Sequence, residues 1–499
     1  MSDGELARRL VSLHQQFRPR QRVVAERRRS TIAHAELGVL PDHSPPSETT
    51  TGTWRVEIPA WCRDQRNLMS TPADDARLVV KALNSGAPAV LLDLEDSLAN
   101  FWPRLRLGID NIRAALHGEL TYSDAATGRA VRIERDTGVT YVRVRGLHIG
   151  QGGIIPGEAM SASLYDLASI FYRLDLERLA HPLCVMNFKS EFADEALSWR
   201  DVFVALTDSR QLPRNYIKCM VIAESHPLAY ALEEFAYNLR DHIVGLTLGR
   251  LDYMASLIHC NFEDPRWVLP DRNDIPHDAP FYQRLRDLIV DISHKRGLLA
   301  IGGMTALFPA RDDPARNARA LAVLEADKRN EATCLMDGAW TGHPDQNEIA
   351  LRQFPAPNQR FVRKPSVERY PELRIPVAGA RTLSGSRAAA ASIVAYRHAL
   401  LHGHGVSLID GFMEDMATER IYRLTLAQRV RHCETVPILD GTGVAVHHGL
   451  RALQALFDGA LETIHAALPV HTPPAVYERY REARHAGEAL IVGHAHDPI

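Results

Sequence analysis

Residues 89–96 read Ala-Val-Leu-Leu-Asp-Leu-Glu-Asp, a short apolar run that ends in three carboxylates. Apolar runs of this length are typical of strands buried on both faces of a parallel sheet. Similar runs, each ending near a polar residue or a glycine, span residues 139–144, 184–186, 217–222, 243–248 and 298–301. Helix-like segments such as 228–239 and 281–294 lie between most of them. Strands that alternate with helices over about 250 residues predict an α/β fold, a (β/α)8 TIM barrel.

The rest of the sequence predicts further regions around this barrel. Residues 1–85 are helical and loop-rich and are expected to form an N-terminal helical clasp, with the barrel spanning 86–350. The Pro- and Arg-rich stretch 351–385 is interpreted as a linker, and the helical pattern of 386–499 predicts a C-terminal helical domain. Two strand-like segments within 118–138 interrupt the alternation, which predicts a small β-hairpin inserted into the barrel.

Composition and charge exclude several classes of protein. Apolar residues make up 45% and charged residues 24%, and the net charge is −3, so neither a disordered chain nor a nucleic-acid-binding protein is expected. No apolar run reaches the roughly 18 residues of a membrane span, and no secretory signal is recognisable. The six cysteines form no CxxC motif, which favours reduced thiols. The chain ends in Asp497-Pro498-Ile499 rather than the Ser-Lys-Leu peroxisomal address, so a cytoplasmic protein is expected.

The predicted barrel mouth is acidic. The carboxyl ends of barrel strands converge there, and catalytic side chains are expected at that edge. The candidates are Asp93, Glu95, Asp96, Glu224 and Asp252, with Arg143 and Arg145 nearby. Carboxylates in one small volume repel each other strongly, and they are tolerable together if a divalent cation lies among them. An oxygen-only set favours Mg²⁺ over Zn²⁺. The alternative is a solvated acidic loop or an aspartate that caps the next helix.

Residues 240–253 read Arg-Asp-His-Ile-Val-Gly-Leu-Thr-Leu-Gly-Arg-Leu-Asp-Tyr, which resembles the signature of the malate synthase family. The resemblance runs from about Leu13 to about Cys433 and is greatest to the shorter, A-like type, within the superfamily of CoA-ester lyase and aldolase barrels. Other matching blocks are residues 94–98, 143–148, 268–272, 294–297, 302–304, 326–328 and 413–415. Such blocks in the same order and at similar spacing make the match specific.

The resemblance implies an acyltransferase that condenses acetyl-CoA with glyoxylate and hydrolyses malyl-CoA to malate and CoA, a reaction of the glyoxylate cycle. It implies a Mg²⁺ ion held by Glu224 and Asp252, which would polarise the carbonyl of glyoxylate. It also implies that Asp93, Glu95 and Asp96 orient metal-bound waters. Gly249, Arg250 and Leu251 would bind the substrate, with backbone N–H groups holding its carboxylate and the glycine permitting a close approach.

The family's general base maps to Asp415, and its catalytic arginine maps to Arg143. A thioester methyl group is a weak acid, with a pKa on the order of 20, so the forming enolate must be stabilised. A fixed guanidinium suits that task because it stays charged and donates hydrogen bonds. Strand alternation puts Arg143 and Arg145 on one side, so spacing alone does not separate them. Lys328 and Lys189 stand where the family also has lysine and are candidates for contacts with CoA phosphates.

Some positions depart from the family pattern. Thr247, Leu251 and Ala255 replace Asn, Trp and Phe, and Phe188-Lys189-Ser190 replaces Pro-Lys-Thr. The lost aromatic volume at positions 251 and 255 would leave room for a larger 2-oxo acid, so the same Mg²⁺ chemistry in a specialised pathway is an alternative. A malyl-CoA or citramalyl-CoA lyase-like activity is another, although those lyases are typically shorter. A non-catalytic relative that binds CoA is a third, and it is disfavoured because all four residues with implied chemical roles are present.

Overall fold

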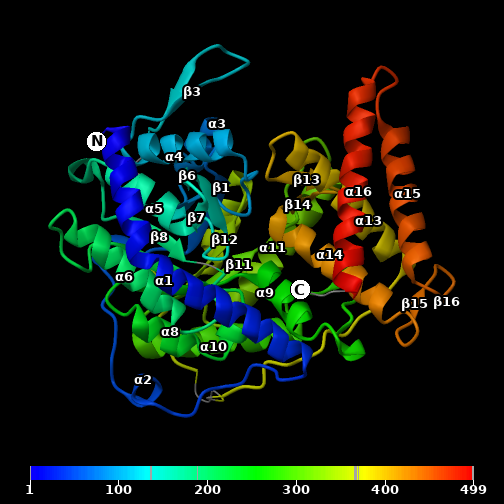
Figure 1. Ribbon diagram of the computed structural model, residues 1–499, viewed down its shortest axis with the longest axis horizontal. Coiled ribbons are helices and arrows are strands. Elements are labelled where there is room, and N and C mark those ends of the chain that lie inside the picture. The colour runs from blue at the N-terminus through cyan, green and yellow to red at the C-terminus, as the bar shows by residue number, and fades with distance from the viewer. Residues whose placement is uncertain (1, 135–137, 188, 365–367, 369, 497–499) are drawn as a thin grey trace. The chain divides into compact units, whose positions relative to one another are not determined.

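The computed structural model describes residues 2–134, 138–187, 189–364, 368 and 370–496. The chain folds into two compact units (Figure 1). The barrel unit consists of Met1–Thr31, Pro41–Arg250 and Leu285–Pro371, and the helical unit consists of Ile32–Leu40, Leu251–Arg284 and Glu372–Ile499. Phe188, one of the positions that depart from the family pattern, lies outside the described residues. The C-terminal residues 497–499, on which the expected location in the cytoplasm rests, lie outside them too.

Eight parallel strands close into a barrel, which confirms the predicted fold class. Around the barrel the order is β1 (Asn67–Pro72), β2 (Ala89–Asp93), β5 (Val139–Arg143), β8 (Cys184–Asn187), β9 (Lys218–Ala223), β10 (Ile243–Leu248), β11 (Leu299–Met304) and β12 (Gly338–Thr341), which pairs with β1. Apolar side chains from these strands, such as Leu91, Tyr141 and Met220, form one buried core. The pairing of β2 with β5 sets Asp93 opposite Arg143. Parallel register therefore brings the polar ends of neighbouring strands to one edge of the barrel.

Helices surround the barrel strands, as expected for parallel strands joined by crossovers. They are α3 (Ala76–Leu83), α4 (Trp102–Leu116), α5 (Ala162–Arg173), α6 (Glu195–Asp208), α7 (His226–Ala229), α8 (Leu232–Asn238), α10 (Pro280–Arg296), α11 (Pro314–Thr333) and α12 (Pro344–Gln353). The predicted single helix 228–239 is thus divided into α7 and α8. The helix α1 (Asp3–Glu36) begins the chain, and the short α2 (Glu48–Thr51) follows it. Short 3₁₀ turns lie at Ala60–Cys62, Leu176–Arg178, Pro265–Trp267 and Arg272–Asp274.

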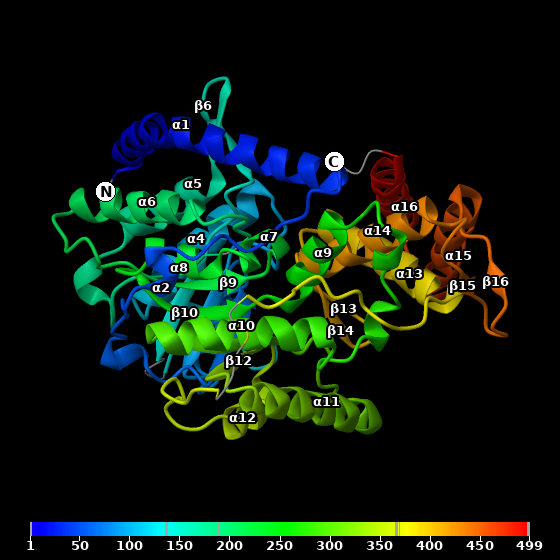
Figure 2. The ribbon, with the colours of Figure 1, turned by 90° about the horizontal axis from the view of Figure 1, so that it is seen from below.

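The N-terminal helix α1 is tied to the barrel unit by ion pairs. Arg28 donates from Nε and Nη2 to both carboxylate oxygens of the buried Glu195, at 2.8 and 2.7 Å. Arg20 pairs with Asp201 on the same helix α6, at 2.5 Å. In Figure 2 the residues of α1 that belong to this unit lie across α5 and α6. These pairs hold α1 on the barrel unit, the clasp itself stays a prediction, and the segment 1–85 also contains β1, the first barrel strand.

Two hairpins decorate the barrel unit. The predicted one consists of β3 (Thr121–Ser123) and β4 (Ala130–Arg132), which pair antiparallel. A second, β6 (Gly150–Ile155) with β7 (Glu158–Ser161), was not predicted. Its sequence, Gly-Gln-Gly-Gly-Ile-Ile, is rich in glycine, which is depleted in strands and so hides the pattern.

The helical unit is built from four long helices and two small hairpins. The helices are α13 (Leu383–Leu401), α14 (Met416–Arg431), α15 (Leu450–Ala467) and α16 (Pro474–His496), and α9 (Arg250–Cys260) enters this unit after its first residue. The hairpins are β13 (Ser407–Ile409) with β14 (Phe412–Glu414), and β15 (Ile438–Leu439) with β16 (Ala445–Val446). α13 packs against the other three long helices, and α15 and α16 run side by side (Figure 1). Across the described residues, no helix combines the length and apolar character needed to cross a membrane.

Candidate active site

The carboxyl ends of β2 and β5 are joined by a bidentate ion pair. Arg143 donates from Nε to Oδ1 of Asp93 and from Nη2 to Oδ2, both at 2.6 Å. Asp93 also accepts hydrogen bonds from the backbone N–H groups of Glu95 at 2.8 Å and Ser97 at 3.0 Å. One carboxylate therefore fixes both the turn after β2 and the orientation of the guanidinium. Bidentate pairing of this kind adds directional specificity to charge attraction.

Lys189 connects this strand end to Glu224. Its Nζ donates to Oδ1 of Asp96 at 2.6 Å and to Oε2 of Glu95 at 3.1 Å. Its backbone N–H donates to Oε1 of Glu224 at 2.5 Å. The backbone of Lys189 has a φ of 47°, an unusual value for a residue with a side chain, and it aims both groups toward carboxylates. Lys189 was expected to contact a CoA phosphate, and its ammonium is instead engaged with two carboxylates of the barrel mouth.

Charge at this edge is balanced by the protein's own cations. Burial and the charge of Asp96 raise the pKa of Glu95 well above its usual range. Burial opposes ionisation of Asp96 too, but Lys189 and Arg143 outweigh it and lower the pKa of Asp96. Burial also disfavours the charge of Arg143, yet Asp93 and Asp96 raise the pKa of Arg143 well above its ordinary value. Arg143 and Lys189 therefore compensate much of the charge of Asp93, Glu95 and Asp96, and the role of these three carboxylates beside a metal ion stays a prediction.

The structure separates the two arginines that sequence spacing left equivalent. Arg145 donates from Nε and Nη2 to Asp166, at 2.9 and 2.7 Å. Its remaining contacts go to Oδ1 of Asn100 at 3.0 Å and Oε1 of Gln151 at 2.8 Å. Arg145 therefore anchors α5 and the β6–β7 hairpin. Arg143 instead belongs to the network of carboxylates that reaches Glu224, which favours it as the catalytic arginine.

Gly249 is required by the packing of Glu224. Glu224 directly follows β9, and its side chain is almost completely buried. A Cβ atom added to Gly249 would lie 2.4 Å from the Cβ atom of Glu224 and 2.7 Å from its Oε2. The same Cβ atom would lie 2.6 Å from Cγ2 of Ile222, so any larger residue at 249 would displace Glu224 and Ile222. The sequence predicted that Gly249 lets the chain approach a ligand. The packing of Glu224 is a second reason why this position needs a glycine.

Lys328 lies in a buried network rather than on a phosphate-binding surface. Its Nζ donates to the carbonyl oxygen of Gly303 at 2.5 Å, and to Asp327 and Glu331 at 3.1 Å each. The residue has no exposed surface. An ammonium group has three N–H donors, and here three acceptors take them. The prediction that Lys328 contacts a CoA phosphate therefore finds no support in this geometry. Arg250 joins the same network, with its Nη1 atom 3.7 Å from Oδ2 of Asp327.

The start of α9 carries the predicted substrate-binding backbone. Because α9 begins at Arg250, the N–H groups of Leu251 and Asp252 belong to its first turn, where N–H groups lack intrahelical acceptors and attract anions. The side chain of Asp252 is buried, Leu251 is partly exposed, and Ala255 is completely buried. Asp252 belongs to the helical unit and Glu224 to the barrel unit. Leu251 and Ala255, which were predicted to leave room for a larger 2-oxo acid, both lie on α9. The N–H groups in the first turn of this helix can bind an anion.

Asp415 is the N-cap of α14. Its Oδ1 accepts the N–H of Thr418 at 3.0 Å, and the hydroxyl of Thr418 accepts the N–H of Asp415 at 2.8 Å, which completes a capping box. The β13–β14 hairpin turns at Asp410 and Gly411, which have φ values of 50° and 86°, and leads directly into this cap. Asp415 is partly exposed. Asp415 therefore caps α14, and its role as the general base stays a prediction.

The neighbouring Glu414 is engaged in a different way. Its Oε2 accepts from Nη1 of Arg272 at 2.7 Å, and its Oε1 accepts from the hydroxyl of Tyr422 at 3.2 Å. The guanidinium of Arg272 also lies 4.7 Å from the centre of the Tyr422 ring. All three side chains are buried. Glu414 is therefore part of a structural ion pair, and of the two adjacent carboxylates Asp415 is the better candidate for a base. Sequence analysis missed this pair, although Arg272 lies in one of the matching blocks.

The departure at Thr247 is explained within the barrel. The indole N–H of Trp340 on β12 donates to the hydroxyl oxygen of Thr247 on β10 at 2.7 Å. Thr247 in turn lies with its hydroxyl 3.4 Å from the carbonyl oxygen of Gly302. A short hydroxyl therefore satisfies a large buried indole across the barrel interior. This contact gives Thr247 a packing role in the barrel core.

Comparison with known proteins agrees with this geometry. Residues 139–368 match the model of the malate synthase TIM barrel domain. Malate synthase A of Escherichia coli is 34% identical over 86% of this chain and 82% of its own length. A malate synthase of Streptomyces clavuligerus is 34% identical over 90% of this chain and 84% of its own. A Haloferax volcanii malate synthase, solved as a pyruvate/acetyl-CoA ternary complex, shares the fold, with a TM-score of 0.51, 16% identity and coverage of 84% and 98%.

Proposed function

The chain belongs to the malate synthase family, and from this membership we propose that it condenses acetyl-CoA with glyoxylate and hydrolyses the malyl-CoA formed to malate and CoA. The observation that carries the proposal is the 34% identity to malate synthases over most of the chain. The rigid guanidinium of Arg143 supports it, because enolate chemistry needs a fixed positive donor. The placement among CoA-ester lyase and aldolase barrels is part of the same proposal.

The proposed metal ligands are Glu224 and Asp252. Both carboxylates are buried, with 3% and 6% of their surface exposed, and oxygen donors are those that Mg²⁺ prefers. Burial of a carboxylate is costly unless a cation or hydrogen-bond donors compensate it, so this donor set fits a divalent ion. When bound, Mg²⁺ supplies Lewis-acid polarisation of the aldehyde carbonyl. The backbone N–H of Lys189 holds one oxygen of Glu224 and so fixes the direction of its carboxylate.

The proposed proton transfer uses Asp415 and Arg143. Asp415 accepts a proton from the methyl group of acetyl-CoA, and the electron pair of that C–H bond forms the enolate. Arg143 donates a hydrogen bond to the enolate oxygen as negative charge develops there. The enolate carbon then attacks the aldehyde carbon of glyoxylate, the electron pair of the C=O π bond moves to the oxygen, and that oxygen takes a proton from water to become the hydroxyl group. Water then cleaves the thioester to release CoA. Asp93 keeps the guanidinium in one orientation, so no reorganisation is needed during the reaction.

Asp93, Glu95 and Asp96 were expected to orient metal-bound waters. Their contacts with Arg143 and Lys189 support a different main task, which is to hold these two cations at the barrel mouth. The first turn of α9, with Arg250, Leu251 and Asp252, remains the proposed carboxylate-binding backbone. A contact of Lys189 with a phosphate of acetyl-CoA stays a proposal. To make that contact, the ammonium group would have to leave its ion pairs with Glu95 and Asp96.

The decisive experiment measures CoA release with acetyl-CoA, Mg²⁺ and a panel of 2-oxo acids. We expect glyoxylate to give the highest kcat/KM, and Glu224→Gln to abolish most of the release. Glu325→Gln changes a partly exposed glutamate that pairs with Arg329 and serves as the matched control. A clearly higher kcat/KM with pyruvate or a longer acid would support the specialised acceptor. Cleavage of malyl-CoA to acetyl-CoA and glyoxylate as the main activity would support the lyase instead, and no reaction at all would contradict the proposal.

A further inference from the structure

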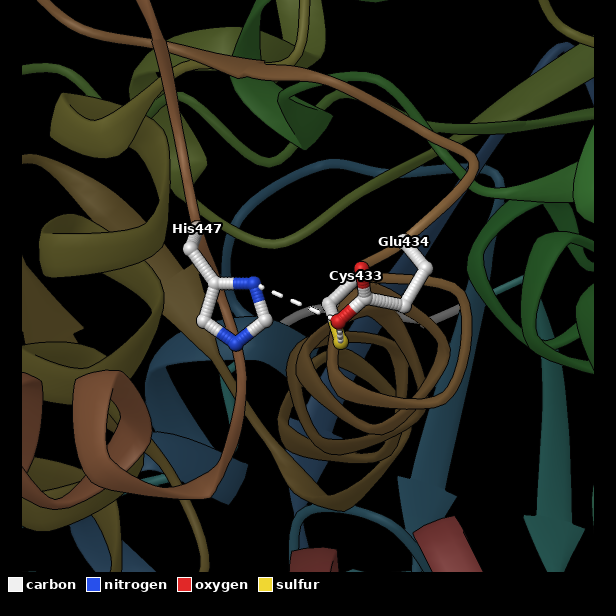
Figure 3. Close-up of side chains that lie close together, drawn as sticks. All are labelled: Cys433, Glu434 and His447. Carbon is white, nitrogen blue, oxygen red and sulfur yellow. Dashed lines mark hydrogen bonds and ion pairs between the residues drawn. The ribbon is translucent and has the colours of Figure 1, made fainter.

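A group of three unlike metal-ligand side chains lies at the end of α14. Cys433 and Glu434 follow the last turn of that helix, and His447 follows β16. The ligand atoms of these residues all lie within 4.8 Å of one another. Nδ1 of His447 is 3.6 Å from Oε1 of Glu434, and Sγ of Cys433 is 3.9 Å from the same oxygen. Figure 3 shows the imidazole and the thiol directed toward that one carboxylate.

These separations are near those of a tetrahedral metal site. With Zn–S of about 2.3 Å and Zn–N or Zn–O of about 2.0 Å, tetrahedral ligands lie about 3.3–3.6 Å apart. The distances from Nδ1 of His447 and Sγ of Cys433 to the Glu434 oxygen exceed these ligand–ligand separations by a few tenths of an ångström. The distance from the sulfur of Cys433 to the imidazole nitrogen of His447 is at most 4.8 Å. The side chains of Glu434 and His447 are 83% and 64% exposed, so modest rotations bring the three atoms onto one ion. Their exposure also leaves a fourth position for water.

The backbone on both sides of the group is held firmly. At the end of α14, Arg431 pairs with Glu263 at 2.8 Å, and Nε2 of His432 lies 2.8 Å from the carbonyl oxygen of Phe262. The β15–β16 hairpin pairs Ile438 with Val446, which returns the chain toward the helix end. Such anchors lower the entropy lost when three ligands are fixed by one ion.

The β15–β16 hairpin and the glycine after it place the imidazole. Within the hairpin loop, Asp440 accepts the backbone N–H groups of Thr442 and Val444, at 2.8 and 3.0 Å. A Cβ atom at Gly449 would lie 2.7 Å from Nε2 of His447. The glycine therefore makes room for the ring in the position that directs Nδ1 to Glu434. Two elements distant in sequence thus converge on one small volume.

We propose that Cys433, Glu434 and His447 bind a borderline-soft divalent cation, Zn²⁺ or a metal of similar preference. Sulfur and imidazole ligands select such ions over Mg²⁺, whose preferred ligands are oxygens. This makes the site chemically distinct from the carboxylate pair Glu224 and Asp252. A bound ion links the end of α14 to the segment that begins α15. Since Asp415 caps the other end of α14, the ion stabilises the helix that carries the proposed base.

The test is a Co²⁺ titration of the full chain in the presence of saturating Mg²⁺ and a thiol-free reductant. We expect one equivalent of Co²⁺ to produce a thiolate-to-metal charge-transfer band, which Zn²⁺ then abolishes by displacement. Cys433→Ser should remove the band, and His447→Ala should weaken Co²⁺ binding by at least about 10-fold, since even outer-shell changes cost 10–100-fold. Cys334→Ser, a partly exposed cysteine at the end of α11, is the matched control and should keep the band.

The variants change exposed or partly exposed residues, so far-UV circular dichroism should show intact folding. CoA release by Cys433→Ser should equal that of the unchanged protein, because the site takes no part in the proposed chemistry. Addition of Zn²⁺ should raise the melting temperature of the protein and of Cys334→Ser but not that of Cys433→Ser. A charge-transfer band that persists in Cys433→Ser, or that never appears in the unchanged protein, would overturn the proposal.

Discussion

Replacement of Asp415 by asparagine separates the two roles that its position allows. As the N-cap of α14, Asp415 accepts the N–H of Thr418 at 3.0 Å, and the amide oxygen of asparagine accepts the same bond. Asparagine and aspartate are about equally good N-caps, whereas alanine costs about 1 kcal/mol. Loss of the charge near the helix N-terminus costs about 0.3–1 kcal/mol. The melting temperature should therefore fall by no more than about 4 °C.

The effect on the reaction should be much larger. A side chain that acts as general base contributes roughly 10²–10⁴ to the rate, or about 2.7–5.5 kcal/mol of activation free energy. Asparagine cannot take the proton, so we expect Asp415→Asn to bind Mg²⁺ and acetyl-CoA almost normally. Exchange of the acetyl methyl protons with solvent deuterium, followed by mass spectrometry, should nearly cease. CoA release with glyoxylate should fall by the same factor.

A matched control is available in the same chain. Asp313 is the N-cap of α11, and its Oδ1 accepts the N–H of Arg316 at 3.0 Å, with the same spacing of three residues. Asp313→Asn should change the melting temperature by a similar small amount and leave deuterium exchange intact. Normal exchange in Asp415→Asn would refute the assignment of the base. A loss of activity that is matched by extensive unfolding would show that the cap is the role that matters.

Three further changes test the barrel unit. Glu224→Gln removes one charged oxygen ligand, so half-maximal CoA release should need at least about 10-fold more Mg²⁺. An unchanged Mg²⁺ titration would count against Glu224 as a metal ligand. Arg143→Lys loses the bidentate contact with Asp93, so kcat should fall roughly 100-fold with a smaller change in KM. An equal effect from Arg145→Lys would contradict the assignment of Arg143 as the catalytic arginine. Lys328→Met removes the ammonium that pairs with the buried Asp327 and Glu331, and it should lower the free energy of unfolding in urea by about 3 kcal/mol, the lower end of the range for a broken buried ion pair, because Arg286 still contacts both carboxylates. A raised KM for acetyl-CoA at unchanged stability would instead restore the CoA-phosphate role of Lys328.

Six of the eight barrel strands could be predicted because their apolar runs reflect burial on both faces. The two that were missed, β1 and β12, pair with each other. β1 contains the buried polar residue Asn67, and the hydroxyl oxygen of Thr341 on β12 lies 3.0 Å from its Oδ1. Thr341 also bonds Oδ1 of Asn347 at 2.7 Å. Polar strand residues are stable inside a protein when such partners exist, and partners 274 residues apart leave no local pattern in the sequence.

In the candidate site too, positions set by local sequence could be predicted, whereas contacts between residues far apart in the sequence could not. The positions of Asp93 and Arg143 at strand ends could be predicted, because parallel strands share one carboxyl edge. The bridge formed by Lys189 could not, because it depends on a backbone with positive φ that connects one strand end to Glu224. The burial of Lys328 was also hidden, since its acceptors come from β11 and α11. Likewise, Cys433 and His447 meet only through the register of the β15–β16 hairpin.

Acidity at a barrel mouth is therefore weaker evidence for a metal ion than its sequence pattern suggests. Asp93, Glu95 and Asp96 come together because Arg143 and Lys189 lie among them, with separations of 2.6 Å for the shortest pairs. Burial and the charge of Asp96 raise the pKa of Glu95 well above its usual range. A more selective signal is a buried carboxylate that packs against a glycine, as Glu224 does, together with Ile222, against Gly249. A backbone N–H of Lys189 fixes one oxygen of Glu224, whereas both oxygens of Asp93 accept hydrogen bonds from the guanidinium of Arg143.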